Sequence, residues 1–233
     1  MANSESSIRN SLFATRPLQN RVTPTGDIIA TPERGIFTGN RGIIHDPATK
    51  TLLTKRWSSP AWITCLCEFR GWRRPVMARR SWTELFFLDE ATAFAAGHRP
   101  CFFCRRDDAK RFRAAWEKGN GVSDVSAKAM DAVLHQERLD RGKKRLHELP
   151  MPLAQLPDGA MVQQGDDSFV VVRGRALLWS LAGYVAGTHE LSRPMLLTPP
   201  STLCAMNAGY EVALHPSVQP APSPLAGEGG GEG

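Results

Sequence analysis

The sequence lacks features that mark several classes of protein. None of its 233 residues lies in a run that approaches the roughly 18 consecutive apolar residues of a membrane span, which excludes a transmembrane protein. The N-terminus, MANSESSIRN, has no basic stretch followed by an apolar one, so we expect no secretory signal, no contact with a membrane and a cytoplasmic location. Five cysteines are too few for a disulfide framework, which the cytoplasm also disfavours.

The sequence also lacks the short motifs of several large enzyme classes. It has no nucleophile elbow, no Walker loop and no dinucleotide-binding fingerprint, so no motif of this kind assigns a reaction. It does have a hydrophobic content of 42%, which predicts a folded core rather than general disorder.

Composition divides the chain into five segments. Residues 1–20 show no helical or strand period and are expected to form a disordered arm, and the Pro- and Gly-rich residues 219–233 a disordered tail. Between them we expect a metal-binding module at 21–120, a helical connection at 121–155 and a β-rich region at 156–218. The predicted fold class is α+β, with short strands and helices around the metal, central helices, and a small C-terminal meander with a short helix.

Short apolar runs separated by Gly and Pro predict short strands in the first half of the chain. These runs cover residues 27–30, 42–44, 61–69 and 85–88. A second group of β-rich runs, separated by turn residues, predicts a meander in the C-terminal region. Its runs cover residues 159–164, 167–174 and 175–181.

Helical patterns begin at Asp89, which is the expected N-cap of a first helix that stops at Gly97. The spacing of Phe112 and Trp116 places both rings on one face of a second helix, predicted at 107–118. Further helices are predicted at 126–149, where Gly142 can interrupt the helix, and near 198–210, with Thr198 or Ser201 as the cap.

The most specific motif is AAGHRPCFFCRR, residues 95–106, in which Cys101 and Cys104 form C-x2-C. This spacing lets two thiolates reach one ion from a tight turn whose backbone N–H groups point at the sulfurs. A redox motif is the alternative, but this one does not open a helix of a thioredoxin-like βαβ unit. We therefore predict that both cysteines bind a metal, and thiolates favour zinc among ions that need no redox chemistry.

The remaining ligands of this site have several candidates. Cys65 and Cys67 lie upstream, and in a regular strand they point to the same face, so four thiolates would complete a tetrahedral site. The same spacing also allows one ligand and one buried core cysteine, and His98 and His45 are alternative ligands. Cys204 lies in an apolar stretch and is expected to pack in the core.

Residues 86–106, FFLDEATAFAAGHRPCFFCRR, resemble the second half of the zinc-binding domain of Ada-type DNA repair proteins, which act on methylphosphotriesters. The residues that fit the pattern of that family are Phe87, Ala91, Ala96, Gly97, Arg99, Pro100, Cys101, Cys104 and Arg105. The resemblance implies a zinc site in which this run supplies two of four cysteine ligands. Two other segments, RGIFTGNRGIIHD and LLTPPSTLCAMNAGYEVALHPS, are similar to a family of bacterial proteins, a likeness that implies no activity.

The chain departs from the Ada pattern at two points. His98 takes the position of an aromatic residue. The first cysteine pair of that family is spaced C-x3-C, and one of the two accepts the methyl group, whereas this chain has C-x-C in an apolar run. The resemblance therefore implies zinc more than methyl transfer, for which Cys65 or Cys67 is the candidate acceptor.

Positive charge is concentrated around the cysteines. Residues 55–113 contain thirteen Lys and Arg against six Asp and Glu, a net charge of +7 where the whole chain has +6. Within them FRGWRRPVMARRSW combines five arginines with Trp72 and Trp82, and such side chains bind phosphates and stack on unpaired bases. The alternative is an Arg-rich loop that is exposed to solvent and has no binding role. The residues expected to contact DNA or RNA are Arg70, Arg73, Arg74, Arg79, Arg80, Arg99, Arg105 and Arg106.

Three polar residues are candidates for catalysis. His45 and Asp46 end the Gly-rich stretch TGNRGIIHD, and a histidine followed by an aspartate can act as a general base with its orienting partner or bind a metal. The alternative is a turn, which Asp46 would begin. Glu84 lies in an apolar run, either as a buried carboxylate with a raised pKa or on the solvent side of a strand.

Three functions follow from these residues. The first is a zinc-binding protein whose closed cysteine site is structural and whose arginines contact DNA or RNA. The second is a zinc-dependent hydrolase or nuclease, in which three protein ligands leave the fourth metal position open. The third is a sacrificial methyl acceptor of the Ada kind. The number of protein ligands separates the first function from the second.

Overall fold

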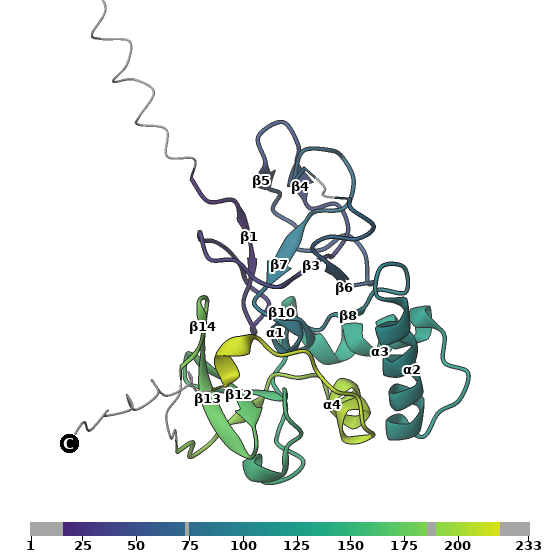
Figure 1. Ribbon diagram of the computed structural model, residues 1–233, viewed down its shortest axis with the longest axis vertical. Helices are drawn as coiled ribbons and strands as arrows, with labels where there is room; N and C mark the ends of the chain where they lie inside the picture. The colour runs from purple at the N-terminus through teal and green to yellow at the C-terminus, as the bar shows by residue number, and fades with distance from the viewer. Residues whose placement is uncertain (1–15, 73–74, 186–189, 220–233) are drawn as a thin grey trace, which may run out of the picture.

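The computed structural model describes residues 16–72, 75–185 and 190–219 (Figure 1). Within them the chain forms two main β-sheets, two short ribbons and four α-helices, so the fold class is α+β as the sequence predicts. Residues 1–15 of the predicted arm and 220–233 of the predicted tail lie outside the described residues. The end of the predicted arm is not irregular, because the first strand already begins at Gln19.

Six short strands form the first sheet, drawn in purple and blue in Figure 1. They are β1 (Gln19–Val22), β2 (Ile28–Ala30), β3 (Phe37–Asn40), β6 (Ile63–Leu66), β7 (Leu85–Phe87) and β8 (Arg99–Pro100). Their order is β2-β1-β7-β3-β6-β8. The β1–β7 and β6–β8 pairs are parallel, and the other pairs are antiparallel. Strands β2, β6 and β7 lie within the predicted runs.

The strand predicted at 42–44 is wrong. A turn follows β3, and β4 (His45–Asp46) then pairs with β5 (Thr51–Leu52) in a separate ribbon. Gly42 has a φ of +89°, in the left-handed region, and its N–H donates to Oδ1 of Asn40. An Asx-type turn with a glycine in this conformation replaces the extended chain.

One face of the first sheet packs into the core, and the other face carries the candidate site. Side chains alternate between the two faces of a strand, and residues paired across strands share a face. Phe87 packs in a hydrophobic cluster with residues of α1 (Glu90–Ala95) and its end. Thr38 pairs with Cys65 on one side and with Phe86 on the other, so these three side chains lie on the opposite face.

Helix α1 begins and ends where the sequence predicts. Oδ1 of Asp89 accepts the N–H of Thr92 at 2.9 Å, which is an N-cap hydrogen bond. The helix ends at Ala95, and Gly97 follows with a φ of +87°. A Cβ at Gly97 would lie 2.5 Å from the side chain of Arg138, so glycine is required there for space as well as for conformation.

The second and third helices lie beside each other on the right of Figure 1. Helix α2 (Arg106–Asn120) confirms the prediction and buries Phe112 and Trp116. Helix α3 (Ala127–Arg138) begins at the cap residue Ser126, whose side chain accepts the N–H of Ala129.

Helix α3 is shorter than predicted. The chain after it forms a hairpin of β9 (Leu139–Asp140) and β10 (Lys143–Lys144). Between these strands Arg141 and Gly142 have φ values of +49° and +81°, a backbone that no right-handed helix continues through.

The second sheet is the predicted meander, with two further strands. It comprises β11 (Met161–Gln164), β12 (Asp167–Val172), β13 (Arg175–Ser180), β14 (Gly183–Val185) and β15 (Met195–Leu196). Their order is β14-β13-β12-β11-β15, and all pairs are antiparallel.

Helix α4 (Pro200–Asn207) follows the second sheet and ends before Gly209, as predicted. Its N-cap is Pro199 rather than Thr198 or Ser201. Thr198 is engaged elsewhere, because its hydroxyl accepts the N–H of Met161 at the start of β11. Two 3-10 turns complete the structure, η2 (Leu153–Gln155) and η3 (Pro216–Val218).

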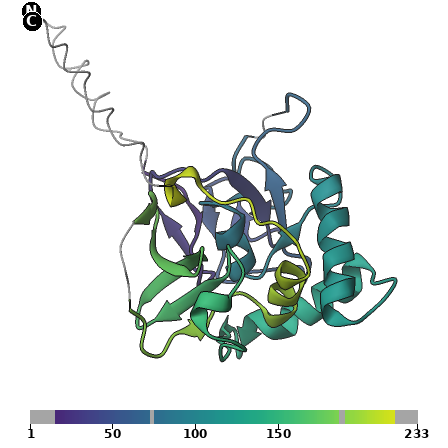
Figure 2. The same cartoon turned by 60° about the horizontal axis from the view of Figure 1, so that its bottom comes forward.

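A single hydrophobic cluster joins the helices to the second sheet. Figure 2 shows α4 between this sheet and the pair α2 and α3. The cluster contains Trp116 from the predicted metal module, Leu134 from the predicted connection, and Phe169 and Leu203 from the predicted C-terminal region. The packing therefore crosses the predicted segment boundaries. Among the described residues, no helix is long and apolar enough to cross a membrane.

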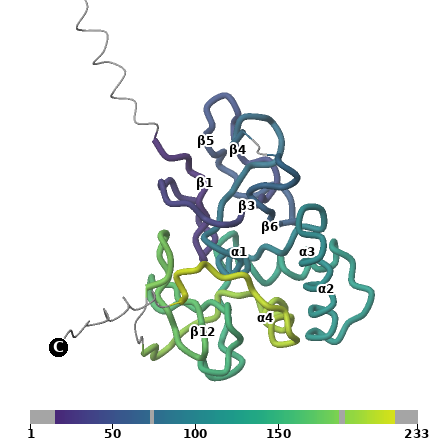
Figure 3. The backbone as a smooth tube through the Cα atoms, in the orientation of Figure 1, coloured from purple at the N-terminus to yellow at the C-terminus, as the bar shows by residue number. Residues whose placement is uncertain are grey.

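The segment after α4 runs back between the two sheets, as the yellow tube in Figure 3 shows. Two buried carboxylates at the start of α1 hold it there. Oε2 of Glu90 accepts the N–H of Ala213 at 2.9 Å, and Oδ2 of Asp89 accepts the N–H of His215 at 3.0 Å. The C-terminal segment is therefore anchored at the start of α1.

Candidate metal centre and adjoining cavity

Three cysteines lie together at the edge of the first sheet. The Sγ atoms of Cys65, Cys101 and Cys104 all lie within 4.8 Å of one another, so these residues could hold a metal ion. Strand β6 supplies Cys65, and the turn after β8 supplies the other two. The N–H of Cys101 donates to the carbonyl of Thr64 at 2.9 Å, which fixes the turn against β6. We call this set the thiol cluster.

The turn that carries Cys101 and Cys104 is held from both ends. The N–H of Phe103 donates to Sγ of Cys101 at 3.4 Å, and the N–H of Arg105 donates to the carbonyl of Cys101 at 3.0 Å. Side-chain hydrogen bonds from Cys104 and Cys65 lower the pKa of the Cys101 thiol. The hydrogen bonds of Cys65 with Cys101 and Cys104 raise the pKa of the Cys65 thiol.

Arg105 anchors the end of this turn. Its guanidinium forms ion pairs with Glu90 at 2.7 Å and Asp108 at 2.8 Å, and Nη1 donates to the hydroxyl of Thr64 at 2.7 Å. The side chain is buried. Arg105 was predicted to contact nucleic acid; instead it joins the thiol cluster to α1, because its charge is fully used inside the protein.

Cys67, a predicted ligand, does not join the thiol cluster. Strand β6 ends at Leu66, so the alternation that would place Cys67 beside Cys65 stops one residue too early. Its thiol lies 3.5 Å from the carbonyl of Ile36, to which it donates, and desolvation raises its pKa. Cys204 lies in α4, partly buried.

Neither alternative histidine ligand reaches the thiol cluster in this structure, since both ring nitrogens of each are engaged. Nδ1 of His98 lies 3.2 Å from the carbonyl of Ala93, and Nε2 accepts from Nε of Arg41 at 3.3 Å. Burial, followed by the charges of Arg41 and a second arginine, lowers the pKa of His98 well below its ordinary value. His45 lies 2.7 Å from the hydroxyl of Thr83 and 3.1 Å from the carbonyl of Arg79.

The catalytic candidates do not line one cavity together, because Glu84 lies apart from the adjacent pair His45 and Asp46. His45 ties β4 to the segment before β7, and Oδ1 of Asp46 accepts the N–H of Ala48, so this pair has the contacts of the turn alternative. Glu84 is buried rather than solvent-facing, and its Oε2 accepts the N–H of Met77 at 2.8 Å. Of the three, Glu84 lines the cavity described below.

The eight predicted nucleic-acid contacts divide into three groups. Arg99, like Arg105, is internal: it forms a buried bidentate pair with Asp131 of α3, with both N–O distances 2.8 Å. Arg73 and Arg74 lie outside the described residues. The exposed group consists of Arg70, Arg79, Arg80 and Arg106.

A cavity of about 750 Å³ adjoins the thiol cluster. Its floor is the free face of the first sheet, with Thr38, Asn40 and Phe86, and its cover comes from the segment between β6 and β7. All three cysteines of the thiol cluster line it. We call it the cysteine cavity. The other lining residues that matter below are Phe69, Arg70, Trp72, Trp82, Glu84 and Phe103.

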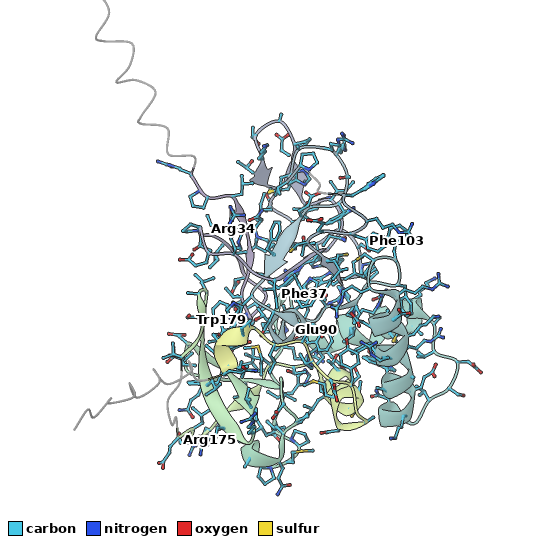
Figure 4. The ribbon with its side chains drawn as sticks, in the orientation of Figure 1. Arg34, Phe37, Glu90, Phe103, Arg175 and Trp179 are labelled. Atoms are coloured by element: carbon cyan, nitrogen blue, oxygen red, sulfur yellow. The ribbon has the colours of Figure 1, made fainter. Side chains whose placement is uncertain are left out.

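Two aromatic side chains of the cysteine cavity project into solvent. Trp72 is 77% exposed and Phe103 is 74% exposed, more than any other large hydrophobic residue of the described chain. In Figure 4 Phe103 lies near the outer edge of the molecule, whereas Glu90 lies inside. The rings of Phe103 and Phe69 pack edge to face with centroids 5.4 Å apart. Neither phenylalanine was predicted from the sequence. Phe103 lies inside C-x2-C, but so does Phe102, which packs against the core, so the spacing alone does not indicate which ring is exposed.

A second unusual group is buried behind the sheet. The guanidinium carbons of Arg41 and Arg138 each lie 4.0 Å from the ring centre of Trp62, so the two cations must stack on opposite faces of the indole. The ammonium of Lys144 donates to the carbonyls of Ala95 and Leu197. Burial lowers the pKa of both arginines to about 9 and that of Lys144 to about 7. We call Arg41, Arg138 and Lys144 the cationic cluster.

Comparison of the chain with protein-family models, with curated proteins and with solved structures gives no match. The likeness of residues 86–106 to the Ada zinc domain therefore stays an expectation. The chemistry of the site rests on its own residues: three thiols that meet at one point, a cavity that they line, and a set of exposed arginines and aromatic rings around it.

Proposed function

We propose that the protein binds zinc through Cys65, Cys101 and Cys104 and uses the fourth metal position to bind a ligand in the cysteine cavity. One observation carries the proposal: the three thiols meet within 4.8 Å, and all of them line the same cavity. Three thiol donors suit zinc, which takes four ligands in a tetrahedral arrangement. A site with three protein ligands leaves one position for water or another molecule.

The number of thiols favours an open site over a closed structural one. Zinc in such a site acts as a Lewis acid on the molecule bound at its free position. The protein contributes the enclosure and a proton-exchanging group, since the buried carboxyl of Glu84 also lines the cysteine cavity. The zinc-dependent hydrolase or nuclease is therefore better supported than a site with a purely structural role.

The exposed arginines support nucleic acid as the partner. Arg70 lines the cysteine cavity, and Arg79 and Arg80 belong to the segment that covers it. Arg106 is the fourth arginine of the exposed group. Among the ion pairs of the described residues, none involves any of these four guanidiniums. Unpaired guanidiniums around a cavity suit the phosphates of DNA or RNA.

The sacrificial methyl acceptor has less support. Such a residue must be an activated thiolate. Cys67 is one candidate, and desolvation raises the pKa of its thiol, which donates to the carbonyl of Ile36. Cys65 is the other candidate, and the zinc proposal already uses it as a metal ligand.

Metal analysis of single-cysteine variants tests the zinc proposal. We expect one zinc ion per chain in the purified protein, and its loss in Cys65→Ser, Cys101→Ser and Cys104→Ser. Cys67→Ser and Cys204→Ser are the matched controls, because neither thiol belongs to the thiol cluster. Both controls should keep the full zinc content.

Two results would contradict the proposal. If the purified wild-type protein is folded but contains no zinc, the proposal that it binds zinc is wrong. If Cys67→Ser loses zinc to the same extent as Cys65→Ser, the site is closed by four cysteines. The proposal of a free fourth metal position would then be wrong.

A further inference from the structure

The metal alone does not explain the cysteine cavity. Its volume of about 750 Å³ is far larger than one ion with a bound water needs. Five of its sixteen lining residues are aromatic, with rings from the sheet, the covering segment and the cysteine turn. A cavity of this size and lining is typical of a site for an organic ligand.

The shape of the covering segment presents aromatic rings at the rim. The N–H of Trp72 donates to the carbonyl of Phe69 at 3.0 Å, and the two residues between them, Arg70 and Gly71, have φ values of +53° and +73°. Positive φ at both central positions marks a tight hairpin turn. The turn places Trp72 on the outside, although exposure of an indole to water is unfavourable. A partner that covers Trp72 and Phe103 would remove this cost.

The charges around the rings narrow the class of that partner. The guanidinium of Arg70 lies 5.1 Å from the ring centre of Phe69, so a cation already sits against the aromatic rim. Two polar residues that line the cavity, Asn40 of the floor and Glu84 just before β7, are buried. Flat rings, polar groups within and cations outside match a nucleobase whose edge enters the cavity and whose phosphate stays at the surface.

We propose that the cysteine cavity receives an unpaired nucleobase, stacked against Trp72 and Phe103, with its phosphate near Arg70. This inference rests on the proposed contact of the exposed arginines with nucleic acid and names the part of the nucleic acid that enters. A base inside a duplex exposes only its edges, so the strand that binds is single-stranded or has the base turned out of the helix. Sequence-tolerant stacking suits this arrangement, because every base has two flat faces.

Binding of two matched strands tests the inference. The probes are a fluorescein-labelled single-stranded DNA of about 12 nucleotides, a length within the usual site range, and a strand of the same length whose sugars carry no bases. We expect the protein as purified to bind the strand with bases more tightly, by roughly tenfold or more. Trp72→Ala and Phe103→Ala should each remove most of that difference and leave binding of the abasic strand unchanged.

Two control variants separate stacking from charge. Trp57→Ala removes another partly exposed tryptophan, one that contacts His135 and does not line the cysteine cavity, and should change neither affinity. Arg79→Ala should reduce the affinity for both strands by the same factor, because it removes a contact to phosphate, which both strands carry. Trp72, Phe103 and Arg79 are exposed, so we expect their replacement to leave the fold intact, and circular dichroism checks this.

The outcomes are distinct. Equal affinity for the two strands, or equal effects of Trp72→Ala and Trp57→Ala, overturns the inference. A free 5′-mononucleotide is tested in the same assay. If it binds as tightly as the strand, the site binds free nucleotides, and the inference that the base belongs to a nucleic acid strand is wrong. Zinc is measured on the same samples: discrimination between strands without zinc contradicts the metal proposal alone, and zinc without discrimination contradicts the nucleobase alone.

Discussion

Lys144 shows how the cationic cluster couples stability to pH. Its ammonium is buried and held by two carbonyl oxygens, and its pKa is lowered to about 7 by burial first and by Arg41 and Arg138 next. In the unfolded chain the amine has an ordinary pKa near 10.4. Between these two values the unfolded state binds more protons than the folded state, so the free energy of unfolding rises with pH.

We therefore expect the urea midpoint of the protein to increase from pH 7 to pH 9.5. The cost of burying Lys144 is fully present below pH 7, where the amine is charged in both states, and it declines steadily as the pH rises from 7 toward the unfolded-state pKa near 10.4. Lys144→Met should flatten this slope and raise the midpoint at pH 7. Lys118→Met, at an exposed lysine near the end of α2, is the control and should keep the wild-type slope. An unchanged slope in Lys144→Met would contradict the assignment.

At the scale of a single element, α1 depends on its first two side chains more than an ordinary helix does. Asp89 caps the helix with Oδ1 and accepts both Tyr184 Oη–H and the N–H of His215 with Oδ2. Every residue of the helix itself is buried. The capping residue of α3, Ser126, makes one hydrogen bond at the surface.

Alanine at these two caps should therefore have different costs. Ser126→Ala loses one exposed cap, at about 1 kcal/mol of unfolding free energy. Asp89→Ala also leaves buried donors without partners, each at about 1–3 kcal/mol, so we expect a total of roughly 3 kcal/mol or more. Chemical denaturation of both variants measures the difference, and equal costs would show that the buried partners of Asp89 contribute nothing.

The same elements show what the sequence could and could not predict. Local signals sufficed for α1, whose cap and terminal glycine are adjacent to it, for α2 with its two rings on one face, and for the meander. They failed at 42–44 and after Arg138, where residues in left-handed conformations turn the chain. Such turns depend on one or two backbone angles, which periodicity does not report.

The candidate site was predictable only in part for a similar reason. Cys101 and Cys104 are close in sequence, so their shared turn could be predicted, and Cys65 follows from its strand. Whether Cys67 also contributes depends on where β6 ends, a matter of one residue. The roles of Arg99 and Arg105 depend on distant carboxylates, Asp131 and Glu90, and no local pattern indicates them.

At the scale of the whole molecule, arginines of similar sequence context have opposite roles. Arg99 joins β8 to α3 through its buried pair with Asp131, and Arg79 lies exposed in the cover of the cysteine cavity. Composition counts both as positive charge. In the fold, the first has a buried ion-pair partner and the second is exposed to solvent.

Alanine variants of Arg99 and Arg79 should separate these roles. Arg99→Ala leaves a buried carboxylate unpaired, so we expect the unfolding free energy to fall by about 3–5 kcal/mol. Arg79→Ala should leave stability unchanged, reduce affinity for single-stranded DNA, and lower the slope of log affinity against log salt by about 0.7. Denaturation and salt titration of each variant measure both properties. A stable Arg99→Ala protein with a reduced salt slope would assign Arg99 to the binding surface instead.

The contact between Glu90 and the segment after α4 also has a consequence for how the protein is made. Glu90 binds Arg105 at the end of the cysteine turn and the N–H of Ala213 near the end of the described chain. A ribosome releases Cys101 and Cys104 more than a hundred residues before Ala213 emerges. The cysteine turn therefore leaves the ribosome before its full support exists, and Glu90 lacks its contact to Ala213 until more than a hundred further residues have been made.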